Sequence, residues 1–353
     1  MMRLRSVLKS FLKRIQKGGA LLRRSVGLTR HSNLESKKEP QDLARMVLHM
    51  AQTGEGTDAC LEIGCLPMLV HFYSPVPDIK DLERRGVWNQ RSDLAGIDFR
   101  VEQQLALLSD LGQAYGKECS WPEKATADPR QFFTHNGSFS FGCAAALHCL
   151  IRYFRPKRIT EIGSGNSSLV MSAALKKNSD EEPGVKTSYT IVDPHPGATV
   201  AAGLPMLSRL TKERVEQIDV RFFEELGEKD ILFIDSGHTV RTGGDVNFLI
   251  LEVLPRLAPG VIVHFHDIPL PYEYQKVYFT NPSFRVFWTE AYLLQSFLTF
   301  NDRFEVLLGM AFLMEEHQAE FCQAFPHFDL QRNWANSGSL WIRRKVEMDK
   351  IAG

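Results

Sequence analysis

The sequence predicts an α/β protein, a doubly wound and mostly parallel sheet with a helical and irregular N-terminal extension. From about residue 136 onward, short apolar runs alternate with segments of helical periodicity, as in parallel strands that helices cover on both faces. Upstream, helical periodicity mixes with proline-rich stretches such as "HFYSPVPD". We therefore expect a basic amphipathic tail and linker over 1–40, the extension over 41–135 and the sheet domain over 136–346.

The composition is that of a soluble globular protein, with 44% hydrophobic and 24% charged residues in 353. No run of 18 apolar residues is present, so no membrane-spanning helix is expected. The six cysteines lack the spacing of a metal site or a disulfide framework, which favours buried thiols in a reducing, cytoplasmic compartment. Residues 41–353 carry 31 Lys and Arg against 40 Asp and Glu, which argues against nucleic-acid binding.

The first 30 residues contain nine Lys or Arg and no acid. Their apolar residues recur at helical spacing, at Leu4, Val7, Leu8, Phe11 and Ile15. A basic amphipathic helix of this kind can lie on an anionic membrane surface, so we expect peripheral membrane contact through residues 1–30. A mitochondrial presequence, a flexible tail and a helix packed on the acidic body are the alternatives.

Three helices are predicted before the first strand. Residues 42–52 have helical periodicity, and Asp98 is expected to cap a second helix within residues 96–116. The buried face of that second helix is expected to contain Val101, Leu105, Leu108 and Leu111. The third segment, "FGCAAALHCLIRYF" at 141–154, is apolar on all sides and predicts a buried helix.

Alternating strands and helices are predicted for the rest of the chain. Five strands are expected in the parallel part of the sheet, at 157–165, 188–196, 215–220, 229–238 and 260–270. Helices are expected at 167–177, near 202–212 and at 244–260. Two closing strands that flank a turn are expected at 304–313 and 339–345.

Four of these strands end in polar or acidic residues, at Glu161, Asp193, Asp235 and the run His264–Asp267. In a doubly wound sheet, ligands bind outside the carboxyl ends of the strands. We therefore expect these side chains to gather at one ligand site. Any single acid at a strand end is also a common turn former or helix cap, so the prediction depends on their number.

A glycine loop follows the first strand in "ITEIGSGNSS". Gly163 and Gly165 allow the backbone to approach a ligand, and Asn166 and Ser167 add amide and hydroxyl donors where the next helix begins. A dinucleotide fingerprint would place a third glycine at position 168, where this sequence has a serine. The missing glycine argues against a nicotinamide-dependent oxidoreductase, and the acid in front of the loop suits a cationic ligand better than a phosphate.

Several segments together resemble a class I S-adenosylmethionine-dependent methyltransferase of the methyltransferase family 24 subgroup. These are "RITEIGSGNSS", "TIVDP", "DILFIDSGHTVRTGGDVNFLILEVLPRLAPGVIVHFHDIPLPYEY" and "FWTEAYLLQSFL". The resemblance implies a Rossmann-like methyltransferase fold that binds S-adenosylmethionine. It implies that Glu161 and the Gly163–Ser164–Gly165 loop face the methionine part, that Asp193 holds the ribose, and that Asp219 and Val220 border the adenine. The full set of expected cofactor-binding residues is Glu161, Gly163, Ser164, Gly165, Asn166, Ser167, Asp193, Asp219, Val220 and Asp235.

The expected catalytic residues are His238, His266 and Asp267, and two mechanisms fit them. In one, a neutral histidine takes the proton of a hydroxyl acceptor while a carboxylate orients its other nitrogen. In the other, Asp235, His238 and Asp267 bind Mg²⁺ or a similar ion that lowers the pKa of the acceptor. Related metal-dependent enzymes place an asparagine where this sequence has Ile268, which weakens the metal mechanism. His264 is expected in the core, and a regular strand would point Asp267 away from His264 and His266.

We expect methylation of oxygen on a small molecule or a glycan, with the 41–135 extension as a cap on the acceptor side. Loop residues expected near the acceptor are Tyr73, Ser74, Tyr272, Tyr274, Trp288, Glu290 and Tyr292. The alternatives are a non-catalytic cofactor-binding module docked on a membrane, a nicotinamide-dependent oxidoreductase, and a metallohydrolase built on "HFHD". The sequence does not indicate an oligomeric state.

Overall fold

The protein is described by a computed structural model that covers residues 40–184, 186–282, 284–333 and 337–346. These residues form two compact units. One unit contains residues 91–274 and those from 288 onward, and the other contains residues 40–90 and 275–287. The predicted boundary near residue 135 falls inside the first unit. The basic segment 1–30 lies outside the described residues.

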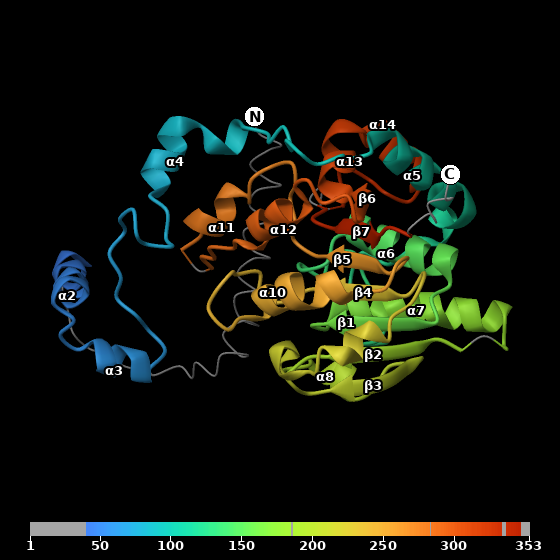
Figure 1. The fold of residues 1–353 in the computed structure, drawn as a ribbon, viewed down its shortest axis with the longest axis horizontal. Helices are drawn as coiled ribbons and strands as arrows, with labels where there is room; N and C mark the ends of the chain where they lie inside the picture. Colours follow the sequence, from blue (N-terminus) through green and yellow to red (C-terminus); the bar gives the residue numbers. More distant parts are fainter. Residues whose placement is uncertain (1–39, 185, 283, 334–336, 347–353) are drawn as a thin grey trace, which may run out of the picture. The chain divides into compact units, whose positions relative to one another are not determined.

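A seven-stranded sheet forms the centre of the first unit, in the order β3-β2-β1-β4-β5-β7-β6 (Figure 1). Neighbouring strands from β3 to β5 are parallel, while β7 is antiparallel to both β5 and β6. The strands are β1 Arg158–Ile162, β2 Ser188–Val192, β3 Leu207–Thr211, β4 Ile231–Ile234, β5 Ile262–Phe265, β6 Phe304–Gly309 and β7 Leu340–Arg344. This is the predicted doubly wound, mostly parallel sheet, and the fold class is confirmed.

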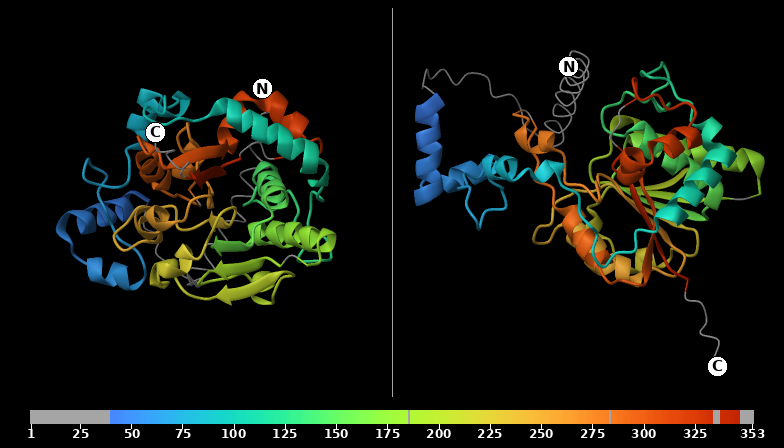
Figure 2. Two further views of the ribbon diagram at one scale, coloured as in Figure 1. Left: turned by 45° about the vertical axis from the view of Figure 1, so that its right-hand side comes forward. Right: turned by 90° about the horizontal axis from the view of Figure 1, so that it is seen from above.

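Helices cover both faces of this sheet (Figure 2). One layer contains α5 Val101–Tyr115, α6 Phe141–Phe154, α7 Asn166–Glu181, α13 Met310–Glu316 and α14 Gln318–Ala324, which pack against one another. The opposite layer contains α10 Asp245–Asn247, the π-helix η4 Phe248–Val253 and α12 Glu290–Leu298. Short helices α8 Ala198–Ala201 and α9 Arg221–Glu224 lie in the connections around β3. Such a crossover pattern brings the carboxyl ends of the parallel strands to one edge.

The predicted buried helix is α6, where residues 141–152 are all buried. Ser140 caps it, because its hydroxyl accepts a hydrogen bond from the Cys143 N–H at 3.3 Å. The second predicted helix, α5, begins at Val101, after a turn in which Asp98 accepts a hydrogen bond from the Arg100 N–H at 3.0 Å. Leu108 and Leu111 are buried as predicted, and α5 packs on α6 and α14.

Two details of the sheet differ from the prediction. The third strand is Leu207–Thr211, where a helix was expected, and the expected strand at 215–220 begins with a 3-10 turn, Val215–Gln217. β3 is an edge strand with only its last residue buried, so its sequence lacks the apolar run of an inner strand. Between β6 and β7 the chain forms α13 and α14, rather than the expected turn.

The second unit consists of short helices: α2 Pro40–Thr53, α3 Thr57–Glu62, α4 Ile79–Arg85, the 3-10 turn Val87–Asn89 and α11 Lys276–Thr280. Within it, the Lys276 ammonium lies 2.7 Å from the Glu83 carboxylate, and Trp88 and Phe279 have ring centroids 6.0 Å apart. The predicted helix at 42–52 is confirmed as α2, which buries none of its residues. Among the described residues, no helix is both long and apolar enough to cross a membrane.

Candidate functional site

The polar residues predicted at the strand ends do come together at one edge of the sheet. Glu161 lies in β1, Asp193 follows β2, and Asp235 follows β4. His266 and Asp267 follow β5. Because these four strands are parallel neighbours, their carboxyl ends lie side by side.

The glycine loop after β1 lies directly against the loop after β4. Gly163 has a φ of +79°, and a Cβ added there would lie 2.1 Å from the Asp235 carbonyl oxygen, so a side chain cannot be accommodated. A Cβ added at Gly165 would meet no atom within 4 Å. The first glycine therefore permits close packing of two loops, and the second leaves open space at the beginning of α7.

Glu161 lies beneath this loop and is fully buried. Its carboxylate accepts hydrogen bonds from the hydroxyls of Ser167 at 2.6 Å, of Ser168 and of Tyr189. Burial raises the pKa of Glu161 to about 7, against the opposing effect of these hydroxyls. The structure therefore places Glu161 as an internal support of the loop, and not on a surface that faces a ligand as expected.

Ser168 explains why the loop lacks a third glycine. Its hydroxyl accepts a hydrogen bond from the Gly165 N–H at 3.0 Å and donates to Glu161. A glycine at this position would leave the Gly165 N–H and the buried carboxylate without these partners. The serine thus stabilises the loop by hydrogen bonding to two of its neighbours.

Asp193 lies at the end of β2, as predicted, with 9% of its surface exposed. One carboxylate oxygen accepts from the His195 N–H at 2.7 Å, and the other accepts from the Ser164 hydroxyl. Each oxygen retains a further lone pair for a ligand hydroxyl. Asn166, at the beginning of α7, donates to the Ser138 hydroxyl at 2.8 Å.

Asp219 and Val220 do not follow a strand, because residues 212–218 separate them from the end of β3. Asp219 is exposed, and its carboxylate accepts from the Arg221 N–H and from the Arg221 guanidinium at 3.0 Å. These hydrogen bonds lower the pKa of Asp219 to about 2. The expected contact of these residues with adenine stays a prediction.

His238 and His266 lie among three carboxylates. His238 Nε2 is 3.2 Å from Asp235 Oδ1 and 3.8 Å from Asp267 Oδ2, while its Nδ1 is 2.8 Å from Glu290 Oε2. His266 Nδ1 is 3.5 Å from Asp235 Oδ1 and 3.4 Å from Asp267 Oδ2. The structure thus brings together the three expected catalytic residues and Asp235. We call these four residues with Glu290 the His238 cluster.

The carboxylates of Asp235 and Asp267 occupy the open side of the His238 cluster. Their side chains are 33% and 23% exposed, against 9% for His238 and 5% for His266. The two aspartate side chains are therefore more accessible to a molecule at the sheet edge than the two histidine side chains are.

The carboxylates keep both imidazoles protonated. Burial alone would lower the pKa of His238, but hydrogen bonds to Asp235 and Glu290 and the charge of Asp267 outweigh it and raise the pKa to about 10. Burial also opposes protonation of His266, yet the charges of Asp267 and Asp235 raise its pKa well above the usual value. These shifts favour the protonated form of both imidazoles, and so they do not support the neutral histidine that the general-base mechanism expects.

Asp267 joins the cluster because the strand does not stay regular. β5 ends at Phe265, and Asp267 has a φ of +55°, which turns its side chain to the side that His266 occupies. His264 lies in the core as expected, stacked on Phe233 at 3.8 Å with Nε2 2.9 Å from the Ser339 hydroxyl. Burial lowers the pKa of His264, so this imidazole is neutral.

The predicted metal site gains no support from the geometry. Asp235 and Asp267 each form an ion pair with His238 directly. Within the described part of the chain, no group of three or more His, Cys, Asp or Glu side chains is arranged to hold a metal ion.

Glu290 is the site residue whose role the sequence did not indicate. It was expected only as a loop residue near the acceptor, yet it lies 1% exposed at the beginning of α12 with its carboxylate on His238. Trp288 packs against the same imidazole, with ring centroids 4.6 Å apart. Glu290 and His238 are 52 positions apart in the sequence, and no local pattern pairs them.

Comparison with known proteins identifies a related family. The sequence model of a family described as a methyltransferase domain matches residues 160–268, which span β1 to the end of β5. An uncharacterized protein from Archaeoglobus fulgidus is 33% identical over 185 residues, which make up 50% of this chain and 80% of that protein. The family match covers the glycine loop, Asp193, Asp235, His238 and Asp267.

Proposed function

The chain belongs to the class I methyltransferase family, and on that premise we propose that it is an S-adenosylmethionine-dependent O-methyltransferase. One observation carries the proposal: Asp193, Asp235 and the pair His266–Asp267 converge beside the Gly163–Gly165 loop at the carboxyl edge of parallel strands. This edge is where doubly wound proteins bind ligands.

The residues at this edge fit S-adenosylmethionine. Asp193 offers carboxylate lone pairs for ribose hydroxyls, and the open space beside Gly165 leaves room for a ligand at the beginning of α7. The partly exposed carboxylates of Asp235 and Asp267 suit a sulfonium cation. A dinucleotide would require a phosphate-binding loop, whereas here the Gly165 N–H is already bonded to Ser168.

When bound, S-adenosylmethionine would supply a methyl carbon that an acceptor oxygen attacks in line, while the carbon–sulfur bond breaks and the sulfur leaves as a neutral thioether. The hydroxyl proton of the acceptor becomes strongly acidic as its oxygen gains a bond, so a nearby carboxylate can take it. We assign this role to Asp267 or Asp235, which reach the open side of the cluster. His238 and His266 lie behind them and balance their charge, so they hold the carboxylates in place before the acceptor arrives.

The acceptor we propose is a neutral hydroxyl compound, a small molecule or a glycan. The two carboxylates on the open side would repel an acceptor that already carries negative charge. A divalent metal is the alternative means of acidifying the hydroxyl, and it is tested in the experiment below.

The test is calorimetric titration of the full-length protein with S-adenosylmethionine and, separately, with NADH, each with and without Mg²⁺. Binding of S-adenosylmethionine alone, unaffected by Mg²⁺, is the expected result. Binding of NADH alone would refute the proposal and favour the oxidoreductase. A requirement for Mg²⁺ would replace proton transfer to Asp267 or Asp235 by a metal-assisted mechanism.

A further inference from the structure

The loop that carries His238 is held by a segment far away in the sequence. His238 has a φ of +55°, which is unfavourable for a residue with a side chain. Its carbonyl oxygen accepts hydrogen bonds from the N–H groups of Thr289 and Glu290, at 2.9 and 3.1 Å. The Thr289 hydroxyl accepts from the Val240 N–H at 2.7 Å. These three hydrogen bonds hold the backbone of the loop in its unfavourable conformation.

The same segment determines the orientation of the imidazole. Trp288 packs against the ring, and the Nδ1–H donates to Glu290 Oε2 at 2.8 Å. With Nδ1 occupied in this way, Nε2 is the nitrogen that faces Asp235 and Asp267. Which nitrogen a histidine presents to a site depends on the hydrogen bond that the other nitrogen makes.

The burial of Glu290 is unfavourable for stability alone. Its side chain is 1% exposed, and its Oε1 has no hydrogen-bond partner among the described residues. A buried carboxylate oxygen without a partner costs folding free energy. The cost has an explanation if the function of this carboxylate is to orient the His238 imidazole and not to stabilise the folded state.

We infer that Glu290 is a positioning residue: its carboxylate accepts the Nδ1–H of His238 and thereby fixes the ring with Nε2 toward Asp235 and Asp267. The inference rests on the proposed function for its catalytic meaning, but the geometry that it invokes can be measured without any turnover. Glu290 acts through His238 and is not expected to touch a substrate.

The chain contains a matched control in a second histidine–glutamate pair, whose histidine is buried. His148 Nε2 lies 2.8 Å from Glu118 Oε2, in contacts between α6 and η2 Gly116–Glu118. A Glu118→Gln variant perturbs a pair of the same length away from the strand ends. It is therefore expected to leave the His238 imidazole unchanged.

The experiment is NMR of the histidine ring protons in the ¹⁵N-histidine-labelled full-length protein at neutral pH, with His238 assigned from a His238→Asn variant. The wild type should show a strongly downfield Nδ1–H resonance, because a carboxylate accepts this hydrogen bond. In Glu290→Gln the resonance should persist but move upfield, since the neutral amide oxygen still accepts. In Glu290→Ala it should be lost by exchange with water. Glu118→Gln should leave it in place.

An unmoved His238 resonance in either Glu290 variant, even with lowered stability, would refute the inference and leave Glu290 a structural residue. Glu290→Gln preserves the side-chain shape, so this variant still tests the inference if Glu290→Ala does not fold. Calorimetry with S-adenosylmethionine on the same samples separates the two proposals. A wild type that fails to bind this cofactor refutes the proposed function, whereas the resonance decides the role of Glu290 independently.

Discussion

Two histidine–glutamate pairs in this protein have the same nitrogen–oxygen distance of 2.8 Å, but the pKa values of their histidines shift in opposite directions. His148 pairs with Glu118, and His238 pairs with Glu290. The pKa of His148 is lowered from its usual value, whereas that of His238 is raised to about 10. The hydrogen bond between the partners therefore does not decide the charge.

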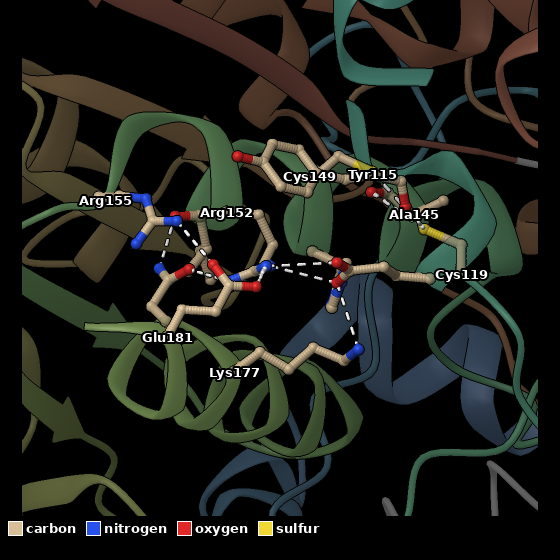
Figure 3. Close-up of polar contacts among 12 residues, drawn as sticks. Tyr115, Cys119, Ala145, Cys149, Arg152, Arg155, Lys177 and Glu181 are labelled. Atoms are coloured by element: carbon tan, nitrogen blue, oxygen red, sulfur yellow. Dashed lines mark hydrogen bonds and ion pairs between the residues drawn. The ribbon is translucent and has the colours of Figure 1, made fainter. Parts of the chain in front are cut away.

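The neighbouring charges account for the difference. Glu118 also contacts the Arg152 guanidinium at 3.1 Å and the Lys177 ammonium at 3.4 Å, and Arg152 is bonded in turn to Glu181 (Figure 3). Burial and these two cations lower the pKa of His148 despite Glu118. The neighbours of His238 are the carboxylates of Asp235 and Asp267 in place of cations, and they raise its pKa.

The two pairs also differ in whether a ligand can reach their charges. The Glu118 pair is one part of a balanced network of ion pairs between helices, so it stabilises the fold. The His238 cluster places three carboxylates around two histidines at an open strand edge, so its charges are available to a ligand.

The largest effect is expected for Arg152→Ala, which removes the central cation of the Glu118 network. Its side chain is 2% exposed, and its loss leaves Glu118 without its closest cation. We expect a fall of about 3 kcal/mol in the free energy of unfolding, at the low end for a broken buried pair because Glu118 keeps part of its hydration. Urea denaturation measures this fall in the free energy of unfolding.

The matched control is Arg155→Ala, which removes a partly exposed partner of Glu181 and should lower the free energy of unfolding by less than about 1 kcal/mol. Equal losses in the two variants would mean that Arg152 has no special structural role.

The next effect is expected for Asp193→Ala at the strand edge. Loss of a charged acceptor for ribose hydroxyls should weaken binding of S-adenosylmethionine by about 10- to 100-fold. Calorimetric titration measures the affinity, with Arg155→Ala as a folded control that should bind as the wild type does. Unchanged affinity in Asp193→Ala would remove Asp193 from the cofactor site.

A smaller effect, visible as a pH dependence, is expected for His238→Asn. Because the folded protein raises the pKa of His238 to about 10, the stability that its charge contributes is fully present below about pH 6.5 and is lost as the pH rises toward 10. The wild type should therefore lose stability across this range, and the variant should lose less. Thermal unfolding at several pH values measures this slope. The slope should persist in His148→Asn, and identical slopes in wild type and His238→Asn would contradict the raised pKa.

The smallest effect is expected for Glu161→Gln, which tests a buried acid that has no cation among its hydrogen-bond partners. Burial raises the pKa of Glu161 to about 7, so the folded wild type holds a proton that the unfolded chain releases between about pH 4.5 and 7. Stability should fall as the pH rises through this window, and the amide variant should not show this fall. Stability curves from pH 4 to 8 measure the difference. If the stability of the wild type and of Glu161→Gln falls equally over this range, Glu161 is ionised in the folded state.

Much of the site could be predicted from the sequence because it depends on local patterns. The apolar run before Gly163 and the acids at Asp193 and Asp235 indicate strand ends, and parallel topology then brings them to one edge. The edge strand β3 was not predicted, because only one of its residues is buried and its sequence therefore has little hydrophobic periodicity. Ser168 signalled a departure from a dinucleotide loop, but its hydrogen bonds to Gly165 and Glu161 are visible only in the fold.

The sequence alone was sufficient for the sheet class, the family resemblance and the residues at the strand ends, because each depends on periodicity or on spacing along the chain. The tertiary structure alone revealed that Glu161 faces inward, that Asp267 turns toward His266 and that Glu290 holds His238. It also revealed that the pKa of His238 is raised while that of His148 is lowered. Proton states depend on which charges are neighbours in space, and the charges that decide them here come from segments far apart in the chain.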